Sequence, residues 1–447
     1  MALPHDPPSD RSKGTESRVQ ASERNALVLS FLYFFCVLAA YYMMRPVRDQ
    51  LSAAVGSTQL PSFFAATFLA TLALTPLFGW LVSHWPRKVV VPVVYLFFIA
   101  CLIAFVPLFA RDGLVSPRAL GTVFFVWVSV FNLFVVSVFW SFMADIWNEE
   151  QARRLFPIIG LGGTSGAIAG PVMTKLLVGV LGVAPLLMVS AGLLGASLLC
   201  AMWLGRWSRQ ALPDAAHAPD LQGTGGGMFD GLKQVFATPF IRNMAILMLL
   251  GDAIGTIAYA LVTDYSKASF VDPVDRTRFS ANMDLATNIL QISVQLTLTR
   301  WLLVRHGAGP VIGVWAVVGL LACVCMALSS NPYAPVIGGM PWVAVMLIVT
   351  RGLSYGMVQP ARESLYTHVP RDWRYKGKNA VDTAVWRAGD VMSASAMNGL
   401  RALGAGIPVF GWIGAGALAL SGLIGWRLAR QVEGRAAMPA PTTPARE

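Results

Sequence analysis

Long apolar runs, separated by short polar segments, recur along nearly the whole chain. Most are roughly 18 to 25 residues long, and an α-helix needs about 20 apolar residues to cross the hydrocarbon core of a bilayer. The pattern therefore predicts an all-α integral membrane protein with about twelve transmembrane helices. We expect these spans at 26–44, 60–82, 89–109, 119–144, 157–180, 183–205, 241–263, 281–303, 309–329, 341–360, 379–400 and 406–428.

A polar segment at 206–240 divides the chain near its middle. It contains prolines, acidic residues and the glycine-rich run from Gly223 to Gly227, which is typical of a flexible linker. The spans on either side then form two bundles of about six helices each, a major-facilitator-like arrangement. We expect a polar cytoplasmic N-terminus at 1–25, an N-terminal six-helix bundle at 26–205, a cytoplasmic linker at 206–240, a C-terminal six-helix bundle at 241–428 and a disordered cytoplasmic tail at 429–447.

Composition agrees with a membrane protein and sets its orientation. Apolar residues make up 55% of the chain and charged residues only 13%, which is far from the balance of a soluble domain. The net charge of +11 comes from Lys and Arg residues spread over short loops, mostly on the side of the N-terminus. The positive-inside rule then predicts a multi-pass protein of the bacterial inner (plasma) membrane with both termini cytoplasmic. Because the basic residues form no single patch, we expect the lipid bilayer, and no nucleic acid, as a partner.

Enzyme chemistry finds no support in the sequence. All five cysteines lie within apolar spans, where they behave as small hydrophobic residues, and no histidine lies in the middle of a span. We therefore expect no metal, cofactor or disulfide framework. The run from Gly160 to Gly166 resembles a phosphate-binding loop only superficially, because no strand precedes it.

Basic residues inside or beside the spans are the candidate ligands of a solute. A charge at membrane depth is costly unless it is paired or faces a watery cavity. Arg45 and Arg48 share one face of a continued first helix, and a guanidinium binds phosphate or carboxylate through two hydrogen bonds at once. The alternative is snorkelling to the interface, with Asp49 as a salt-bridge partner. The expected substrate-binding residues are Arg45, Arg48, Lys175, Arg351, Lys378 and Arg387.

Acidic residues and one basic loop are candidates for gating or ion coupling. Lys378 and Asp382 are four residues apart and Arg387 and Asp390 three apart, so we expect each pair to meet along the eleventh span. Whether these residues hold substrate, relay protons or only pair with one another is left open by the sequence, and the basic loop alone could merely set topology. The expected gating or coupling residues are Asp49, Asp145, Arg153, Arg154, Asp252, Asp264, Asp382 and Asp390.

Four motifs carry a family resemblance. They are Arg45-Pro-Val-Arg-Asp49, the segment from Phe139 to Asp145, Gln151-Ala-Arg-Arg-Leu-Phe-Pro157 and the segment from Lys378 to Gly389. Together they resemble the bacterial and plastid ATP:ADP antiporter (nucleotide transporter) family, over nearly the whole chain outside the termini and linker. The resemblance implies a major-facilitator-like fold, alternating access and exchange of nucleotides held by basic residues at their phosphates.

The resemblance can be carried over at a few positions. Arg48 matches a position that is typically lysine in the nucleotide exchangers, and Lys378 matches a lysine at the start of the eleventh span. Asp390 stands where better-known exchangers carry a second lysine, and Gln151 replaces an acidic residue. These two departures weaken the inference of ATP itself more than that of the fold.

The sequence thus predicts a secondary transporter, not an enzyme, that exchanges nucleotides or related phosphorylated anions across the membrane. One alternative is a proton-coupled carrier of another small solute that uses Asp252, Asp264, Asp382 or Asp390 as its proton site. Another is a membrane-embedded sensor or assembly factor. Uptake driven by a pH gradient would favour the first alternative, and the absence of any ligand effect on thermal stability would favour the second.

Overall fold

Twelve long helical segments, some of them interrupted, make up the described part of the chain. The computed structural model describes residues 23–110, 115–211, 235–367, 369, 378 and 381–436. Most of the predicted linker, the start of the N-terminus and the end of the tail lie outside these residues. The first half contains α1 (Arg24–Val55), η1 (Ser57–Gln59), α2 (Leu60–His84), α3 (Arg87–Ala110), α4 (Pro117–Ile146), α5 (Glu149–Leu181) and α6 (Val183–Ala211).

The second half contains more interrupted helices. Three π-helical segments lie in its helices, and π-turns are often found at functional sites. Its helices and π-segments are α8 (Pro239–Ser269), α9 (Pro273–Val294), η2 (Gln295–Thr299), α10 (Arg300–His306), α11 (Ala308–Leu328), α12 (Trp342–Leu353), η3 (Ser354–Val358), α13 (Gln359–Thr367), η5 (Val381–Val385), α15 (Trp386–Ala402) and α16 (Ile407–Ala436). A short antiparallel hairpin, β1 (Pro335–Ile337) and β2 (Met340–Pro341), joins α11 to α12. Gly338 and Gly339 form its turn, where both residues have the positive φ that glycine tolerates.

Local sequence explains where several helices begin. Ser116 accepts a hydrogen bond from the backbone N–H of Ala119 at 3.3 Å and caps α4, whose first residue is a proline. Asn148 and Gln151 form a reciprocal capping box at the start of α5. Pro46 does not end the first helix, because α1 continues through it to Val55.

A glycine face on α5 lets this helix lie directly on α1. A Cβ atom added at Gly166 would lie 2.3 Å from the carbonyl oxygen of Phe35, and one at Gly162 would lie 2.4 Å from that of Phe31. Any larger side chain at these positions would collide with backbone. The glycine repeat is thus a packing surface between helices, as small residues commonly are in membranes.

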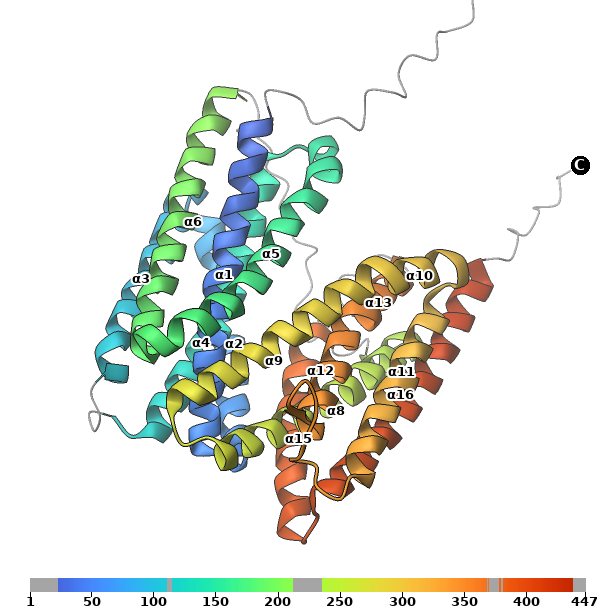
Figure 1. Cartoon of the computed structure of the whole chain (residues 1–447). Helices are drawn as coiled ribbons and strands as arrows, with labels where there is room; N and C mark the ends of the chain where they lie inside the picture. Colours follow the sequence, from blue (N-terminus) through green and yellow to red (C-terminus); the bar gives the residue numbers. More distant parts are fainter. Residues whose placement is uncertain are drawn as a thin grey trace, which may run out of the picture.

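Two bundles, each with its own apolar cluster, lie side by side in Figure 1. They are closest at the end where α1, α8 and α15 finish, and they diverge toward the opposite end. Between them, α5 contacts α9, α2 contacts α15, and α1 contacts both α8 and α9. The first helix, α1, begins at the end where the bundles diverge, and the last helix, α16, finishes at that same end.

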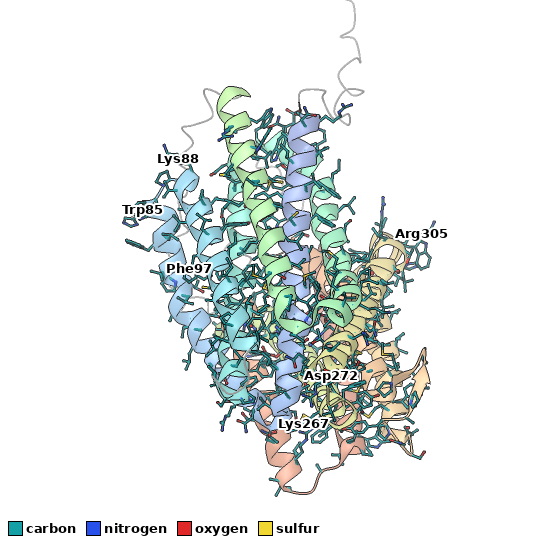
Figure 2. All side chains as sticks on the ribbon, turned by 60° about the vertical axis from the view of Figure 1, so that its left-hand side comes forward. Trp85, Lys88, Phe97, Lys267, Asp272 and Arg305 are labelled. Carbon is teal, nitrogen blue, oxygen red and sulfur yellow. The ribbon has the colours of Figure 1, made fainter. Side chains whose placement is uncertain are left out.

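The outer faces of the bundles suit a bilayer. Large apolar side chains such as Phe97 are exposed along the sides, whereas Lys88, Lys267, Asp272 and Arg305 lie near the two ends (Figure 2). Among the described helices, ten are long and apolar enough to cross a membrane.

Two of the twelve predicted spans, 281–303 and 379–400, are not among these ten helices. Both are helical, but each contains a π-segment and several polar residues. Both contact the first bundle, α9 through α1 and α5, and α15 through α2.

Candidate functional site: a charged cavity between the halves

A cavity of about 470 Å³ lies between the two bundles, within the size range of small-molecule sites. It is lined from both halves by arginines, aromatic rings and a few uncharged polar groups. Its charged lining residues are Arg45, Arg48, Asp252, Arg351, Arg362, Arg387 and Asp390. Its aromatic lining residues are Phe34, Tyr41, Tyr42, Phe64, Phe125, Tyr259, Trp315, Tyr355 and Trp386.

The arginines of α1 are already paired. Arg48 donates to Asp49 Oδ1 from its Nε and Nη2 atoms at 2.9 and 2.7 Å, and the same oxygen accepts the hydroxyl of Tyr259 on α8 at 2.8 Å. Arg45 lies 3.5 Å from Asp284 of α9. Asp49 and Asp284 therefore both take part in contacts that join the halves.

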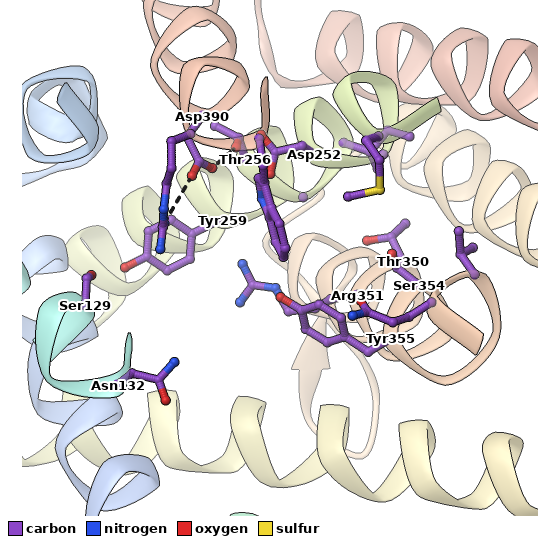
Figure 3. Close-up of a pocket in the computed structure, with 18 of the residues that line it drawn as sticks. Ser129, Asn132, Asp252, Thr256, Tyr259, Thr350, Arg351, Ser354, Tyr355 and Asp390 are labelled. Atoms are coloured by element: carbon purple, nitrogen blue, oxygen red, sulfur yellow. Dashed lines mark hydrogen bonds and ion pairs between the residues drawn. The ribbon is translucent and has the colours of Figure 1, made fainter. Parts of the chain in front are cut away.

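The arginines of the second half are less fully neutralised. Arg387 Nη1 lies 3.6 Å from Asp390 Oδ2, which confirms the predicted contact between these residues, and 36% of the Arg387 side chain is exposed. Arg351 makes no ion pair with any residue that the structure describes. Its guanidinium lies 5.6 Å from the ring centroid of Tyr259 and projects into the cavity (Figure 3). The available positive charge is thus on the side of α12 and α15.

A second ionic network sits beside the cavity. Arg362, whose side chain is only 2% exposed, donates to Asp382 at 2.6 Å, and Lys378 donates to Glu363 at 2.6 Å. The predicted contact between Lys378 and Asp382 is therefore wrong. Asp382 lies in the π-segment η5, and its ion-pair partner is Arg362 from another helix. Lys378 does not line the cavity.

Two carboxyl groups also face the cavity. Asp390 accepts a hydrogen bond from the hydroxyl of Thr256 at 3.2 Å, and Asp252 lies close by on α8 (Figure 3). The Oδ2 atom of Asp252 is buried and has no hydrogen-bond partner among the described residues. Both aspartates were predicted as coupling residues, and the structure brings them to one wall.

The wall formed by α4 was missed by sequence reasoning. Asn132 and Ser129 line the cavity from this helix, opposite Arg351 and Tyr355 (Figure 3). The available signal was a side-chain amide in the middle of an otherwise apolar span. Sequence reasoning also missed Arg362 as a lining residue, because its burial follows from contacts that are distant in sequence.

At the end where the halves are closest, five residues form what we term the closed-end cluster. Asp264 of α8 accepts the backbone N–H and the hydroxyl of Ser57 at 3.1 and 2.8 Å. Arg401 of α15 donates to Asp264 at 2.6 Å and also to the Ser57 hydroxyl. Lys267 donates to the carbonyl oxygen of Val55 at 2.9 Å. Here a carboxylate lies at a helix start and an ammonium group at a helix end, as the helix dipoles favour.

Three further predicted residues, Lys175, Asp145 and Arg154, do not line the cavity. Lys175 of α5 is exposed and does not line it. Asp145 is exposed near the end of α4. Arg154 pairs with Glu23 at 3.1 Å within the first half, so this contact does not cross between the bundles. The side chain of Arg153 lies outside the described part of the structure.

The sequence is similar to those of plastid carriers. It is 23% identical over 419 residues to the chloroplastic ADP,ATP carrier protein 2 of Arabidopsis thaliana, covering 81% of this chain and 67% of that protein. It is 24% identical over 404 residues to the plastidic ATP/ADP-transporter of Solanum tuberosum, covering 78% of this chain and 63% of that protein. The resemblance to the ATP:ADP antiporter family is confirmed. The chain spans about two thirds of the length of these relatives, and no protein-family model matches it.

Solved transporters share the fold of this chain. The nucleoside transporter NupG matches with a TM-score of 0.62 and 15% identity over 94% of this chain and all of that one. A bacterial homologue of the iron transporter ferroportin, in an inward-facing state, matches with a TM-score of 0.63 and 13% identity over 92% and 99% of the two chains. The peptide transporter PepTSo gives the same values. The predicted multi-pass, major-facilitator-like fold is confirmed.

Proposed function

We propose that the chain is a secondary transporter that exchanges nucleotides, or related phosphorylated anions, by alternating access across the bacterial inner membrane. The observation that carries the proposal is the group of five arginines that line one cavity between two helical bundles. The sequence relatives are ADP,ATP carriers by name, and that substrate fits a cavity rich in guanidinium groups.

The pairing of the arginines explains how an anion would bind. Arg351 offers a guanidinium without an ion-pair partner among the described residues, and Arg387 is only loosely held by Asp390. A polyphosphate bound there would gain charge-assisted hydrogen bonds worth roughly 1.5–3 kcal/mol each. Arg45 and Arg48 could join only by leaving Asp284 and Asp49, so binding would compete with contacts between the halves.

Alternating access is supported by the difference between the two ends. The closed-end cluster holds the halves together at one end, while they diverge at the other. With cytoplasmic termini, as the basic loops favour, the diverging end faces the cytoplasm and the conformation is open to the inside. Asp145, Arg153 and Arg154 belong to that end and would meet the other half only when it closes.

Uptake into proteoliposomes tests the proposal. Labelled ATP outside and ADP, inorganic phosphate or nothing inside should give uptake that internal ADP stimulates. Arg351→Gln should reduce this uptake at least tenfold, and Arg48→Ala should abolish it. Lys175→Gln is the matched control, because it removes a cation that does not line the cavity. Uptake that ignores internal ADP and survives Arg351→Gln would refute exchange at this site.

A proton-coupled carrier is the second candidate, favoured by the two carboxyl groups on the cavity wall. Asp252 and Asp390 would bind the proton, which a cavity open to water could deliver. This function predicts solute uptake that is driven by a pH gradient and needs no counter-nucleotide. In Asp252→Asn, the pH gradient should no longer stimulate uptake. Asp275→Asn, which alters an exposed pair on α9, should leave it intact. A pH gradient without effect on uptake would exclude this candidate.

A further inference from the structure

The two walls of the cavity differ in chemistry. On the second half, Arg351 and Arg387 present guanidinium groups that are unpaired or loosely paired among the described residues. On the first half, Arg45 and Arg48 are engaged by carboxylates, so the groups left for a ligand are aromatic rings and Asn132. An anion is therefore attracted to one wall, and an uncharged hydrogen-bonding group to the other.

Asn132 is the only side-chain amide on the wall formed by the described residues of the first half. It makes no hydrogen bond to any residue that the structure describes, although it is half-buried and points into the cavity (Figure 3). The Ser129 hydroxyl, one turn earlier, instead donates to the carbonyl oxygen of Phe125 at 3.0 Å. Asn132 thus offers an unused donor and acceptor side by side.

Such an amide matches one kind of partner. Its carbonyl oxygen and NH₂ group can bind an edge that presents an adjacent donor and acceptor, as adenine does with its amino group and ring nitrogen. Tyr41 lines the same wall, is partly exposed, and supplies a ring on which a flat base can lie.

We propose that Asn132 is a specificity-determining residue that reads the nucleobase, with the phosphates held across the cavity by Arg351 and Arg387. This rests on the proposed function of nucleotide exchange and assigns the orientation of the substrate within that site. The ligand then bridges the two halves, with its base on α4 and its charge on α12 and α15.

Binding measurements on the purified full chain test the assignment. Labelled ATP is competed with unlabelled ATP, GTP and inorganic tripolyphosphate. Asn132→Leu, which keeps the size but removes both polar groups, should weaken ATP binding about 5- to 150-fold, the worth of one bidentate contact. Tripolyphosphate, which has no base, should bind as tightly as before, and this also verifies that the variant is folded. Asn132→Gln should restore part of the lost affinity.

Ser129→Ala is the matched control on the same helix, because its hydroxyl is already used within the chain. It should leave ATP and tripolyphosphate affinities unchanged. The assignment is overturned if Asn132→Leu leaves ATP affinity unaltered, or if it lowers ATP and tripolyphosphate affinities equally. A wild-type chain that binds neither compound would instead reject nucleotide exchange itself.

Discussion

Tyr259 of α8 donates a hydrogen bond to Asp49 of α1 at 2.8 Å and so joins the two halves beside the cavity. The same carboxylate oxygen accepts two hydrogen bonds from Arg48, and the Tyr259 ring lies near the Arg351 guanidinium. One tyrosine therefore contacts both a link between the bundles and the arginine that is open to a ligand. Changes in ligand binding and in the contact between halves should be coupled through it.

Tyr259→Phe keeps the aromatic ring but removes the hydrogen bond to Asp49, so it should weaken the contact between the two halves. Loss of one hydrogen bond costs about 0.5–1.5 kcal/mol, which corresponds to a shift of about 2- to 10-fold toward states in which α1 and α8 separate. We would measure this as faster maleimide labelling of Ala53→Cys, a position buried beside Asp49, in a chain whose native cysteines are replaced. Tyr265→Phe, whose ring packs on Phe270 and Phe279 of its own half, should label at the parent rate. Equal rates in all three chains would contradict the link.

The closed-end cluster should depend on Asp264. Asn398 donates to the carbonyl oxygen of Thr58 at 2.9 Å, so cysteines at these two positions should react with a short bifunctional maleimide when this end is shut. Asp264→Asn removes the charge that Arg401 contacts, and we expect a several-fold lower cross-linking yield. Asp275→Asn, at an exposed pair within α9, serves as the control. An unchanged yield in Asp264→Asn would show that the cluster does not hold this end closed.

The glycine face of α5 predicts that two similar glycine-to-alanine substitutions change the stability of the fold in different directions. Gly166→Ala places a methyl group against the backbone of α1 and should destabilise the fold by about 1–3 kcal/mol. Gly160→Ala meets no atom within 4 Å and should be neutral or stabilising, by up to about 1 kcal/mol, because alanine favours the helix. Thermal denaturation of the two variants in detergent measures the difference. A lower midpoint for Gly160→Ala than for Gly166→Ala would contradict the packing.

The pair of Arg362 and Asp382 should be sensitive to the loss of one partner. Arg362→Leu leaves a largely buried carboxylate uncompensated and should cost up to about 3–5 kcal/mol of stability. The double variant Arg362→Leu with Asp382→Leu should recover much of that loss. Arg278→Gln breaks an exposed pair and should change stability by less than about 1 kcal/mol. Thermal stability checks all three, and a double variant no better than the single one would disprove the pairing.

The membrane spans could be predicted because each depends on a contiguous stretch of residues. Apolar length sets the existence of a helix in a bilayer, and even the polar segments around Asp284 and Asp382 are helical as expected. The contact between Arg387 and Asp390 could be predicted as well, because residues three apart in one helix lie on the same face.

The partners of the buried charges could not be predicted in the same way. Asp284 meets Arg45 and Asp264 meets Ser57 and Arg401 only because helices from different parts of the chain pack together. The sequence shows that such charges need partners but not which helix supplies them. Lys175 illustrates the opposite error, because its place within a span indicated a cavity that it does not line.

Because the glycine face of α5 lies on the backbone of α1, these two helices cannot roll or slide separately. α9 is fastened to both of them, through Asp284 to Arg45 and through Asn288 to the carbonyl oxygen of Ala167 at 2.7 Å. If α9 moves so that Arg45 is released from Asp284, the hydrogen bond from Asn288 to Ala167 of α5 is stretched as well. We therefore expect the two contacts to break together. Under the proposed alternating access, binding of a solute and rearrangement of the contacts between the halves would then be a single step, which leaves no continuous pore.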